Sequence, residues 1–223
     1  MNNKRPGSRP HFISFEGGEG AGKTTLMNRL AKLFSSREIP VLKTREPGGT
    51  PFGEQLRRWI LQHDSSFSFG AKAELLLFLA ARAQHIQEKI APALQQGVLV
   101  LCDRFNDSTV AYQGAGRGLG TEWVRSLCAL VCEEVQPDLT FYLDLDPTVG
   151  LARRSKLDKG EAPNGQLDRI ESEAMLFHQR IREAFLLIVK QEPDRFCFLD
   201  ASQPQEAVFQ AALQRINEQF SHV

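Results

Sequence analysis

The sequence has no long hydrophobic run and no excess of either charge, and both absences narrow the possible functions. The longest apolar stretch, near Leu75–Ala81, is far too short to span a bilayer. Lysine plus arginine and aspartate plus glutamate both number 27, so no net charge favours nucleic acid or a membrane as partner. The polar opening segment MNNKRPGSRP has no apolar signal core, and we therefore expect a cytoplasmic protein.

Cysteines are few and scattered, which argues against a disulfide framework or a metal centre built on thiolates. Cys102, Cys128, Cys132 and Cys197 form no CxxC pair, and no histidine stands at ligand spacing from them. Cys128 and Cys132 lie four residues apart and would share one face of a helix. We interpret the cysteines as reduced packing residues.

Short apolar segments alternate with helical patterns along most of the chain. Such a β-α-β-α alternation predicts an α/β fold, with a five-stranded parallel sheet flanked by helices in one domain covering residues 1–223. The segments expected as buried strands are Phe12–Phe15, Val41–Thr44, Val98–Cys102, Leu139–Leu143 and Phe196–Leu199. The helices expected are Thr24–Phe34, Gly53–Leu61, Ala71–Leu94, Glu122–Val135, Thr148–Arg153 and Asp168–Lys190.

Two segments interrupt this alternation. Gln113–Gly120 is rich in glycine, and Arg153–Gln166 is charged with almost no apolar residue. We interpret the second as an exposed, mobile lid over about residues 153–169, because a helical pattern resumes directly after it. That helix is expected to begin at Asp168, which with Glu171 resembles a capping box.

The strongest motif is GGEGAGKT at Gly17–Thr24, which fits the phosphate-binding P-loop pattern. It follows an apolar strand and opens an amphipathic helix, so backbone N–H groups and the helix N-terminus would surround phosphate oxygens. Lys23 would reach the β- and γ-phosphates of ATP, and the Thr24 hydroxyl would ligate Mg²⁺. A fold of the three-layer P-loop NTPase type is therefore expected, with ATP-binding residues Gly17, Gly18, Glu19, Gly20, Ala21, Gly22, Lys23, Thr24 and Thr25.

Several rival classes of P-loop protein are excluded by what accompanies the loop. A regulatory GTPase would need a guanine-reading Asn-Lys-x-Asp segment, which the chain lacks. A motor or transporter ATPase would need partner modules that 223 residues cannot hold. A small kinase instead needs a second phosphate site that faces the first.

Candidates for that second site stand where predicted strands end. Arg45 follows the second strand, and Asp103 and Arg104 follow the third. Ligands of open α/β sheets collect at the carboxyl ends of strands, so both arginines could bind the acceptor phosphate. Asp103 could hold Mg²⁺ through water, as the acid of a Walker-B strand does.

Taken together, these segments resemble bacterial thymidylate kinases, from about Phe12 to about Pro204. The resemblance implies a homodimeric P-loop nucleoside monophosphate kinase that transfers the ATP γ-phosphoryl group to dTMP, forming dTDP, with Mg²⁺. TREPGGT and AYQG are far more specific to this family than a P-loop alone. The segments that carry the resemblance, in family order, are EGGEGAGKTT, TREPGGTP, LLFLAAR, DRF…STVAYQGAGRG, PDLTFYLDLDP and LDRIE.

Individual roles follow from the same resemblance. Phe78 matches the aromatic residue that stacks on thymine, and Arg82 matches the arginine that hydrogen-bonds the base edge. Ser108 and Gln113 match residues near the base. Tyr112 matches the residue that packs against the deoxyribose, and Glu19 matches the acid that reaches the sugar 3′-hydroxyl. Arg45 and Arg104 match the arginines that bind the acceptor phosphate.

Gly20 occupies a position where some family members carry a basic residue aimed at the ATP phosphates. The bacterial subtype compensates with lid arginines, and this chain offers Arg153, Arg154, Lys156 and Lys159 there, with Arg169 at the far edge of the lid. We favour Arg153 and Arg154 for the catalytic role, because the lysines lack the fork geometry of a guanidinium. Two other readings stay open: a kinase for another pyrimidine monophosphate such as dUMP or CMP, and a nucleotide-binding switch that has no acceptor.

Overall fold

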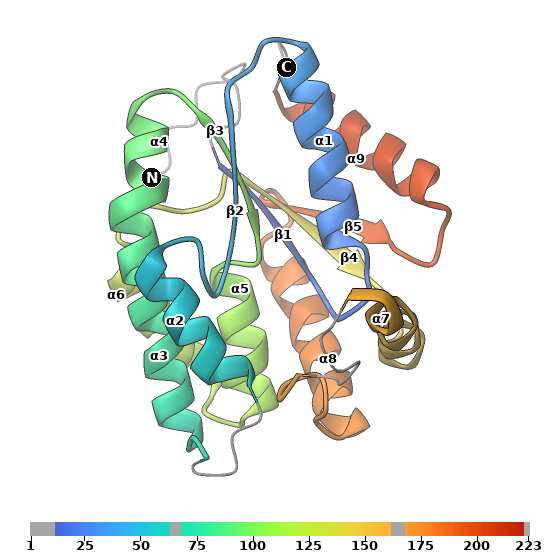
Figure 1. Ribbon diagram of the computed structural model, residues 1–223. Helices are drawn as coiled ribbons and strands as arrows, with labels where there is room; N and C mark the ends of the chain where they lie inside the picture. The colour runs from blue at the N-terminus through green and yellow to red at the C-terminus, as the bar shows by residue number, and fades with distance from the viewer. Residues whose placement is uncertain (1–11, 63–67, 162–167, 221–223) are drawn as a thin grey trace.

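Five parallel strands form the centre of the molecule in the order β2-β3-β1-β4-β5 (Figure 1). The computed structural model describes residues 12–62, 68–161 and 168–220, with side chains described outside 155–161. The prediction of a five-stranded parallel sheet is confirmed. Its strands are β1 (Phe12–Gly17), β2 (Val41–Arg45), β3 (Leu99–Asp103), β4 (Leu139–Asp144) and β5 (Phe196–Asp200).

The register of the sheet aligns the strand ends that matter for function. Asp103 at the end of β3 pairs with Phe15 of β1 on one side and with Arg45 of β2 on the other. Gly17 at the end of β1 pairs with Leu143 of β4. Residues that directly follow β1, β2 and β3 therefore emerge beside one another at one edge of the sheet.

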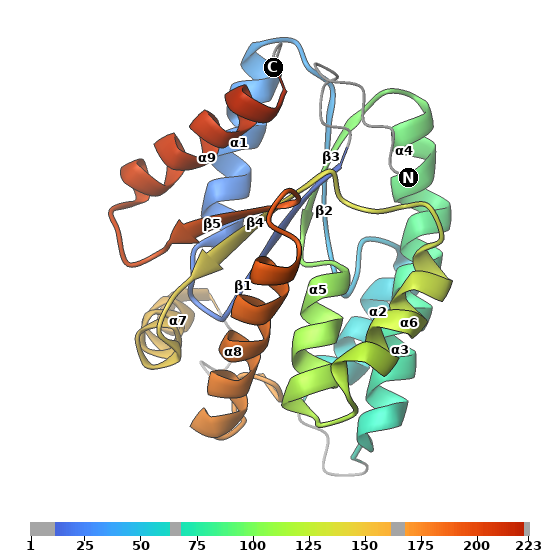
Figure 2. The same cartoon turned by 180° about the vertical axis from the view of Figure 1, so that it is seen from behind.

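Helices cover both faces of the sheet (Figures 1 and 2). Ile13 and Phe15 of β1 pack toward α1 (Lys23–Ser36) and α9 (Gln205–Gln219), through residues such as Leu30 and Ile216. On the opposite face lie α2 (Pro51–Leu61), α3 (Ala71–His85), η1 (Ile86–Ile90), α4 (Ala91–Gln95), α5 (Asn106–Thr109), η2 (Val110–Gly116), α6 (Thr121–Cys132) and α8 (Met175–Gln191). Helix α7 (Pro147–Glu161) lies beside the end of β4 (Figure 1).

The two outer strands are less buried than their sequences predict. Lys43 and Arg45 of β2 are exposed, and Phe198 of β5 is 50% exposed. The expectation of five buried strands is therefore wrong for β2 and β5. The sequence pattern does not show which strands lie at the edges of the sheet. In the observed order β2 and β5 are the outer strands, and each has a neighbouring strand on one side only.

Two helical segments escape the sequence analysis. Helix α9 buries Val208, Ala212 and Ile216 at four-residue spacing, a short pattern in an otherwise polar segment. The glycine-rich stretch read as a break from Gln113 is helical as far as Gly116, in the continuous segment α5–η2. Packing of this segment against α6 and α8 overrides its low helix propensity.

The lid region also differs from expectation. Helix α7 continues past its predicted end at Arg153. The backbone of 154–161 is therefore helical, and the prediction of a loop there is wrong. The rest of the predicted loop, residues 162–167, lies outside the described residues. Asp168 and Glu171 form the predicted reciprocal hydrogen bonds at 2.8 and 2.9 Å. These local bonds close only a turn, and α8 begins at Met175 rather than at Asp168.

The four cysteines are free thiols. Cys102, Cys128 and Cys132 are buried, and Cys197 is partly buried. Within the described ranges, no helix is long and apolar enough to cross a membrane.

Candidate active site

The loop between β1 and α1 has the backbone shape that a phosphate cradle needs. Gly17, Gly20 and Gly22 adopt φ angles of 141°, 65° and 93°, a region that glycine enters without strain. Helix α1 has no acidic residue in its first turn and no side-chain cap from any described residue. Its first N–H groups are therefore available to an anion, which the helix dipole also favours.

Lys23 lies buried at the floor of this loop. Its Nζ donates to the carbonyl oxygens of Gly17 at 3.1 Å and Gly18 at 2.7 Å. Burial and the nearby charge of Arg104 lower the pKa of Lys23. Both effects destabilise the charged form of Lys23, and an anion bound nearby would stabilise it. The electrostatics of the loop therefore favour a phosphate ligand.

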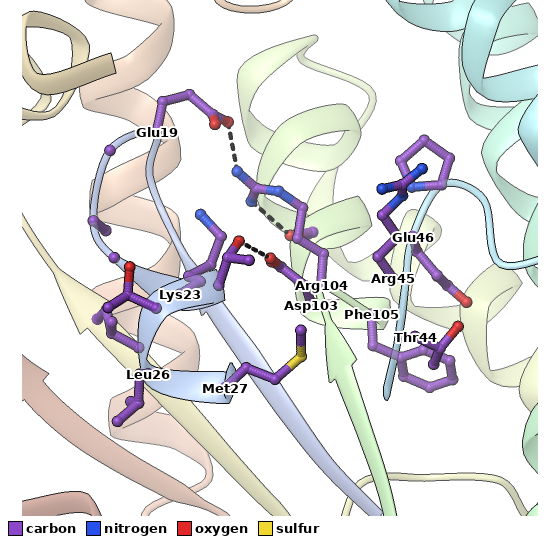
Figure 3. Close-up of a pocket in the computed structure, with 18 of the residues that line it drawn as sticks. Glu19, Lys23, Leu26, Met27, Thr44, Arg45, Glu46, Asp103, Arg104 and Phe105 are labelled. Atoms are coloured by element: carbon purple, nitrogen blue, oxygen red, sulfur yellow. Dashed lines mark hydrogen bonds and ion pairs between the residues drawn. The ribbon is translucent and has the colours of Figure 1, made fainter. Parts of the chain in front are cut away.

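Thr24 and Asp103 meet between the P-loop and the end of β3. The Thr24 hydroxyl donates to the Asp103 carboxylate at 2.6 Å, and both residues line the cleft, where Figure 3 labels Asp103. Mg²⁺ prefers oxygen ligands and commonly takes only one or two from protein beside substrate phosphates. The hydroxyl and carboxylate oxygens fit that requirement. Among the described residues there is no cluster of three or more His, Cys, Asp or Glu side chains that could hold a metal.

Arg104 joins the P-loop to the opposite wall of the cleft. Its guanidinium forms an ion pair with Glu19 (Figure 3). The same group donates to the Gly17 carbonyl at 2.9 Å and to the Ser108 hydroxyl at 3.1 Å. It also lies 5.0 Å from the ring centroid of Tyr112, whose hydroxyl donates to Glu19 at 2.9 Å.

Glu19 is held ionised by this arrangement. Burial alone would raise its pKa, but the charges of Arg104 and Lys23, together with the Tyr112 hydrogen bond, lower it to about 2. The carboxylate and the two cations therefore form a charged cluster at the centre of the cleft.

An aromatic residue and two hydrogen-bonding side chains form a second compartment beyond Arg104. Phe78 is half-buried, and Arg82 and Gln113 are almost wholly buried; all three line the cleft. Arg82 binds Glu46 at 2.7 Å through Nε and Thr109 at 2.8 Å through Nη2. The flat aromatic face and the fixed polar groups suit a planar heterocycle.

Arg45 approaches from the end of β2, on the other side of Asp103 and Arg104 from Lys23 in Figure 3. It pairs with Glu54 at 3.0 Å and is largely exposed. Arg57, which the sequence analysis missed, lines the same wall and donates to the Pro47 carbonyl at 3.0 Å. Burial and the charge of Arg45 lower the pKa of Arg57, so this wall also favours an anion. In the sequence nothing distinguishes Arg57 from its neighbour Arg58, and only the packing of α2 places Arg57 in the cleft wall.

The lid residues divide into two groups. Arg153 donates to the Ala201 carbonyl at 3.1 Å, Arg154 pairs with Glu171 at 2.8 Å, and both line the cleft. Arg169 is not among the residues that line the cleft; its guanidinium binds the Ile60 carbonyl at 2.8 Å and Glu74. In this conformation Arg169 thus connects the far edge of the lid to α2 and α3.

Asp168 also lines the cleft and was missed as a site residue. Burial raises its pKa to about 6, with further contributions from the negative charges of Glu171 and Glu19. The sequence analysis interpreted Asp168 only as a helix cap, and its hydrogen bonds to the backbone of Ile170 and Glu171 do have that form.

One continuous cleft of about 1410 Å³ connects all these groups. Pockets for a single drug-sized ligand measure about 300–1,000 Å³, so this cleft has room for two. One end is walled by Arg153 and by the segment after β5, including Ser202 and Gln205. The other end is walled by Phe78, Arg82 and Gln113, and the P-loop lies between them.

Comparison with known proteins shows which family the chain belongs to. The model of the thymidylate kinase family matches residues 15–212. The chain is 55% identical to the thymidylate kinase of Protochlamydia amoebophila (strain UWE25), over 95% of this chain and 94% of that protein. It is 48% identical to the thymidylate kinase of Chlamydia muridarum (strain MoPn / Nigg), over 91% and 97%. The chain belongs to the thymidylate kinase family.

A solved structure agrees with this assignment. The crystal structure of thymidylate kinase from Ehrlichia chaffeensis superposes with a TM-score of 0.73 at 33% identity, covering 95% of this chain and 99% of that one. The expected resemblance to bacterial thymidylate kinases and the P-loop NTPase type of fold are confirmed.

Within this family fold, the structure gives a physical reason for glycine at position 20. A Cβ added to Gly20 would lie 2.1 Å from the carbonyl oxygen of Gly150 in α7, and one added to Gly150 would lie 2.2 Å from the Glu19 carbonyl oxygen. The P-loop and the helix that leads to the lid therefore touch backbone to backbone. A side chain at either glycine would force them apart.

We predict that Gly150→Ala weakens ATP binding about tenfold or more without unfolding the protein, because it displaces the P-loop amides from the positions in which they face phosphate. The dissociation constant of ATP from isothermal titration calorimetry checks this. Gly70→Ala is the matched control, since its Cβ would meet no atom of the described residues within 4 Å. Unchanged ATP affinity in Gly150→Ala would contradict the prediction.

Proposed function

We propose that this thymidylate kinase family member transfers the γ-phosphoryl group of ATP to dTMP, giving ADP and dTDP. The observation that carries the proposal is the single cleft that joins a P-loop to a second compartment with its own arginines and aromatic residue. A nucleotide switch would not need the second compartment. The family match supports dTMP as acceptor over other monophosphates.

ATP is proposed to bind with its phosphates on the P-loop, Gly17–Thr25, and Lys23 beside the β- and γ-phosphates. Thr24 and Asp103 would hold the Mg²⁺ that accompanies ATP, Asp103 through water. When bound, the ion neutralises charge that develops on the phosphate oxygens. The uncapped N-terminus of α1 acts on the same oxygens.

dTMP is proposed to bind across the cleft. Its phosphate would lie between Arg45, Arg57 and Arg104, which approach from three different elements. Arginine suits this role because its planar fork gives paired hydrogen bonds to phosphate. The base would stack on Phe78 near Arg82, Ser108 and Gln113, and the sugar would contact Tyr112 and Glu19.

Positioning and charge neutralisation would drive the transfer. Phosphoryl transfer requires little covalent work from the protein, and a monophosphate is already largely ionised near pH 7, so no general base is needed. Lys23 and the arginines would hold the two phosphates in line. Closure of the lid over about residues 153–169 would exclude water and bring Arg153 or Arg154 to the transferring group.

A panel of acceptors tests this function. Release of ADP is measured with dTMP, dUMP, CMP and no acceptor, at saturating ATP and Mg²⁺. We expect dTMP to give the highest kcat/KM. A preference for dUMP or CMP would favour another pyrimidine monophosphate kinase, and nucleotide binding without acceptor-dependent ADP release would favour a switch.

Two substitutions separate the two halves of the site. Lys23→Ala removes a charge from the transferring group, so kcat is expected to fall about 10²–10³-fold. Arg104→Ala removes a charge partner of the acceptor phosphate, so dTMP affinity is expected to weaken by about 2–5 kcal/mol, or about 30-fold and more. Arg180→Ala, at an exposed position of α8, is the control. Arg104→Ala with dTMP binding and turnover near wild type would refute the acceptor assignment.

The lid residues make a separate prediction. An arginine delivered by closure is worth about 10³–10⁵ in kcat in related phosphoryl transfers. Because Arg153 and Arg154 both line the cleft, replacing one of them by alanine should lower kcat about a hundredfold or more while dTMP binding holds. Single-turnover rates at saturating substrates check this. If both variants stay within about threefold of wild type, these arginines do not supply the catalytic charge.

A homodimer and a cytoplasmic location complete the proposal. Trp59 of α2, Leu76 of α3 and Leu130 of α6 are 54%, 61% and 74% exposed, and α3 packs against both α2 and α6. We propose that these apolar side chains belong to the surface that the second copy covers. The four free thiols suit a reducing compartment.

The dimer is tested by sedimentation velocity at micromolar concentration. The wild type is expected at twice its 25.0 kDa chain mass, and Leu76→Glu or Leu130→Glu at one chain mass. Leu187→Glu on α8, where the leucine is 59% exposed, should leave the dimer intact. A monomeric wild type would rule out the homodimer.

A further inference from the structure

Glu74 of α3 lies behind the acceptor compartment and has no part in the mechanism above. Its side chain is 1% exposed and accepts hydrogen bonds from three residues. Gln113 donates through Nε2 at 2.9 Å and Arg117 through Nε at 3.0 Å, and Arg169 donates through Nη2. One buried carboxylate therefore connects η2, through Gln113, and the far edge of the lid, through Arg169, to α3.

This carboxylate is ionised. Burial by itself would raise the pKa of Glu74, but the hydrogen bonds from Arg117, Gln113 and Arg169 together lower it. An ionised carboxylate can only accept hydrogen bonds.

Because Glu74 only accepts, it fixes the orientation of the Gln113 amide. The NH₂ group must point at Glu74, and the carbonyl Oε1 must point elsewhere. Gln113 lines the cleft, and Oε1 has no hydrogen-bond partner among the described residues. The NH₂ end of the amide is thus occupied by Glu74, and the carbonyl acceptor is the end that remains for a ligand in the cleft.

Arg82 offers the complementary group beside it. Its contacts with Glu46, Cys128, Phe105 and Thr109 use four of the five guanidinium N–H groups: one at Nε, one at Nη1 and two at Nη2. Within the part of the chain that the structure describes, the second N–H at Nη1 has no acceptor. Arg82 and Gln113 both line the cleft, and Thr109, which Arg82 binds through Nη2, precedes Gln113 by four residues in the segment α5–η2.

A donor next to an acceptor distinguishes pyrimidine bases by their hydrogen-bonding edge. Thymine and uracil present a carbonyl oxygen at C4 and a proton on N3, which match the Arg82 donor and the Gln113 acceptor. Cytosine presents an amino group at C4 and a lone pair on N3, the reverse pattern. With the amide of Gln113 turned over, the cleft would present two donors and the discrimination would be lost.

We propose that Glu74 is a specificity-determining positioning residue, which selects acceptors with a protonated N3 by holding the Gln113 carbonyl toward the base. The inference rests on the proposed function, since it assumes that a pyrimidine monophosphate occupies this compartment. It extends that function by identifying a residue that does not touch the substrate yet sets which edge of the base is accepted.

The test compares dTMP with 5-methyl-2′-deoxycytidine monophosphate, which differs from it only at C4 and N3. Glu74→Gln replaces the acceptor-only group by an amide that can also donate, so Gln113 is free to adopt either orientation. The ratio of kcat/KM for dTMP to that for the analogue is expected to fall at least about tenfold. A site built to hydrogen-bond its substrate can reject a mismatched analogue by about 10⁴–10⁵, so such a fall is measurable.

Two further variants make the result specific. Arg117→Gln removes another partner of Glu74 and leaves the carboxylate on Gln113, so its ratio should stay at the wild-type value. Glu74→Asp keeps the negative charge but shortens the side chain by one methylene, which withdraws the carboxylate from Gln113 and from Arg117, since both bind Oε1. It should relax the ratio even if Glu74→Gln does not fold, and Arg117→Gln shows whether loss of the Arg117 contact alone has that effect.

The outcomes distinguish the role of Glu74 from the kinase function on which that role depends. Wild-type turnover of dTMP reports on the proposed function alone. An unchanged ratio in the Glu74 variants, with kcat/KM lowered equally for both acceptors, would overturn the role of Glu74 and leave the kinase assignment intact. Equal relaxation in Arg117→Gln would also overturn it, because the effect would then be a general loosening of the compartment.

Discussion

The parallel pairing of β1 with β3 is the constraint on which the rest of the site depends. Because Phe15 lies opposite Asp103, the P-loop after β1 and the residues after β3 emerge side by side. The Thr24–Asp103 hydrogen bond and the Glu19–Arg104 ion pair both cross this junction. Donor and acceptor phosphates would therefore meet at the place where two strands end, and the remaining elements shape the two arms of the cleft.

Buried and half-buried carboxylates hold the arginines of the cleft and of the wall behind it. Glu19 holds Arg104, Glu46 holds Arg82, and Glu74 ties Arg117 and Arg169. Buried ion pairs add little net stability, since desolvation offsets much of the Coulomb attraction. Their value here is geometric, because each carboxylate uses some donors of a guanidinium and fixes where the others point. A site that binds two anions needs cations, and the Glu19–Arg104 pair holds one of them in place before the ligands arrive.

The backbone contact between Gly20 and Gly150 adds a link between the P-loop and the helix that leads to the lid. In the sequence, Gly20 is notable only for the basic residue that it replaces. In the structure, its positive φ and its distance to α7 leave no room for any side chain. Position 20 therefore has no cation because α7 packs directly against the P-loop. The same helix carries Arg153 and Arg154, which line the cleft.

The sequence by itself determined the five strands, most helices, the P-loop and the positions of Arg45, Asp103 and Arg104 at strand ends, because these depend on local patterns of apolar residues, glycines and turns. Only the tertiary structure decided that β2 and β5 are half-exposed edges, that the glycine-rich segment from Gln113 is helical, and that Arg57 and Asp168 enter the cleft. The same holds for Glu74, which in the sequence is one acid in a helix. Its contact with Gln113 joins residues 39 positions apart, and such a contact exists only once packing brings α3 and η2 together.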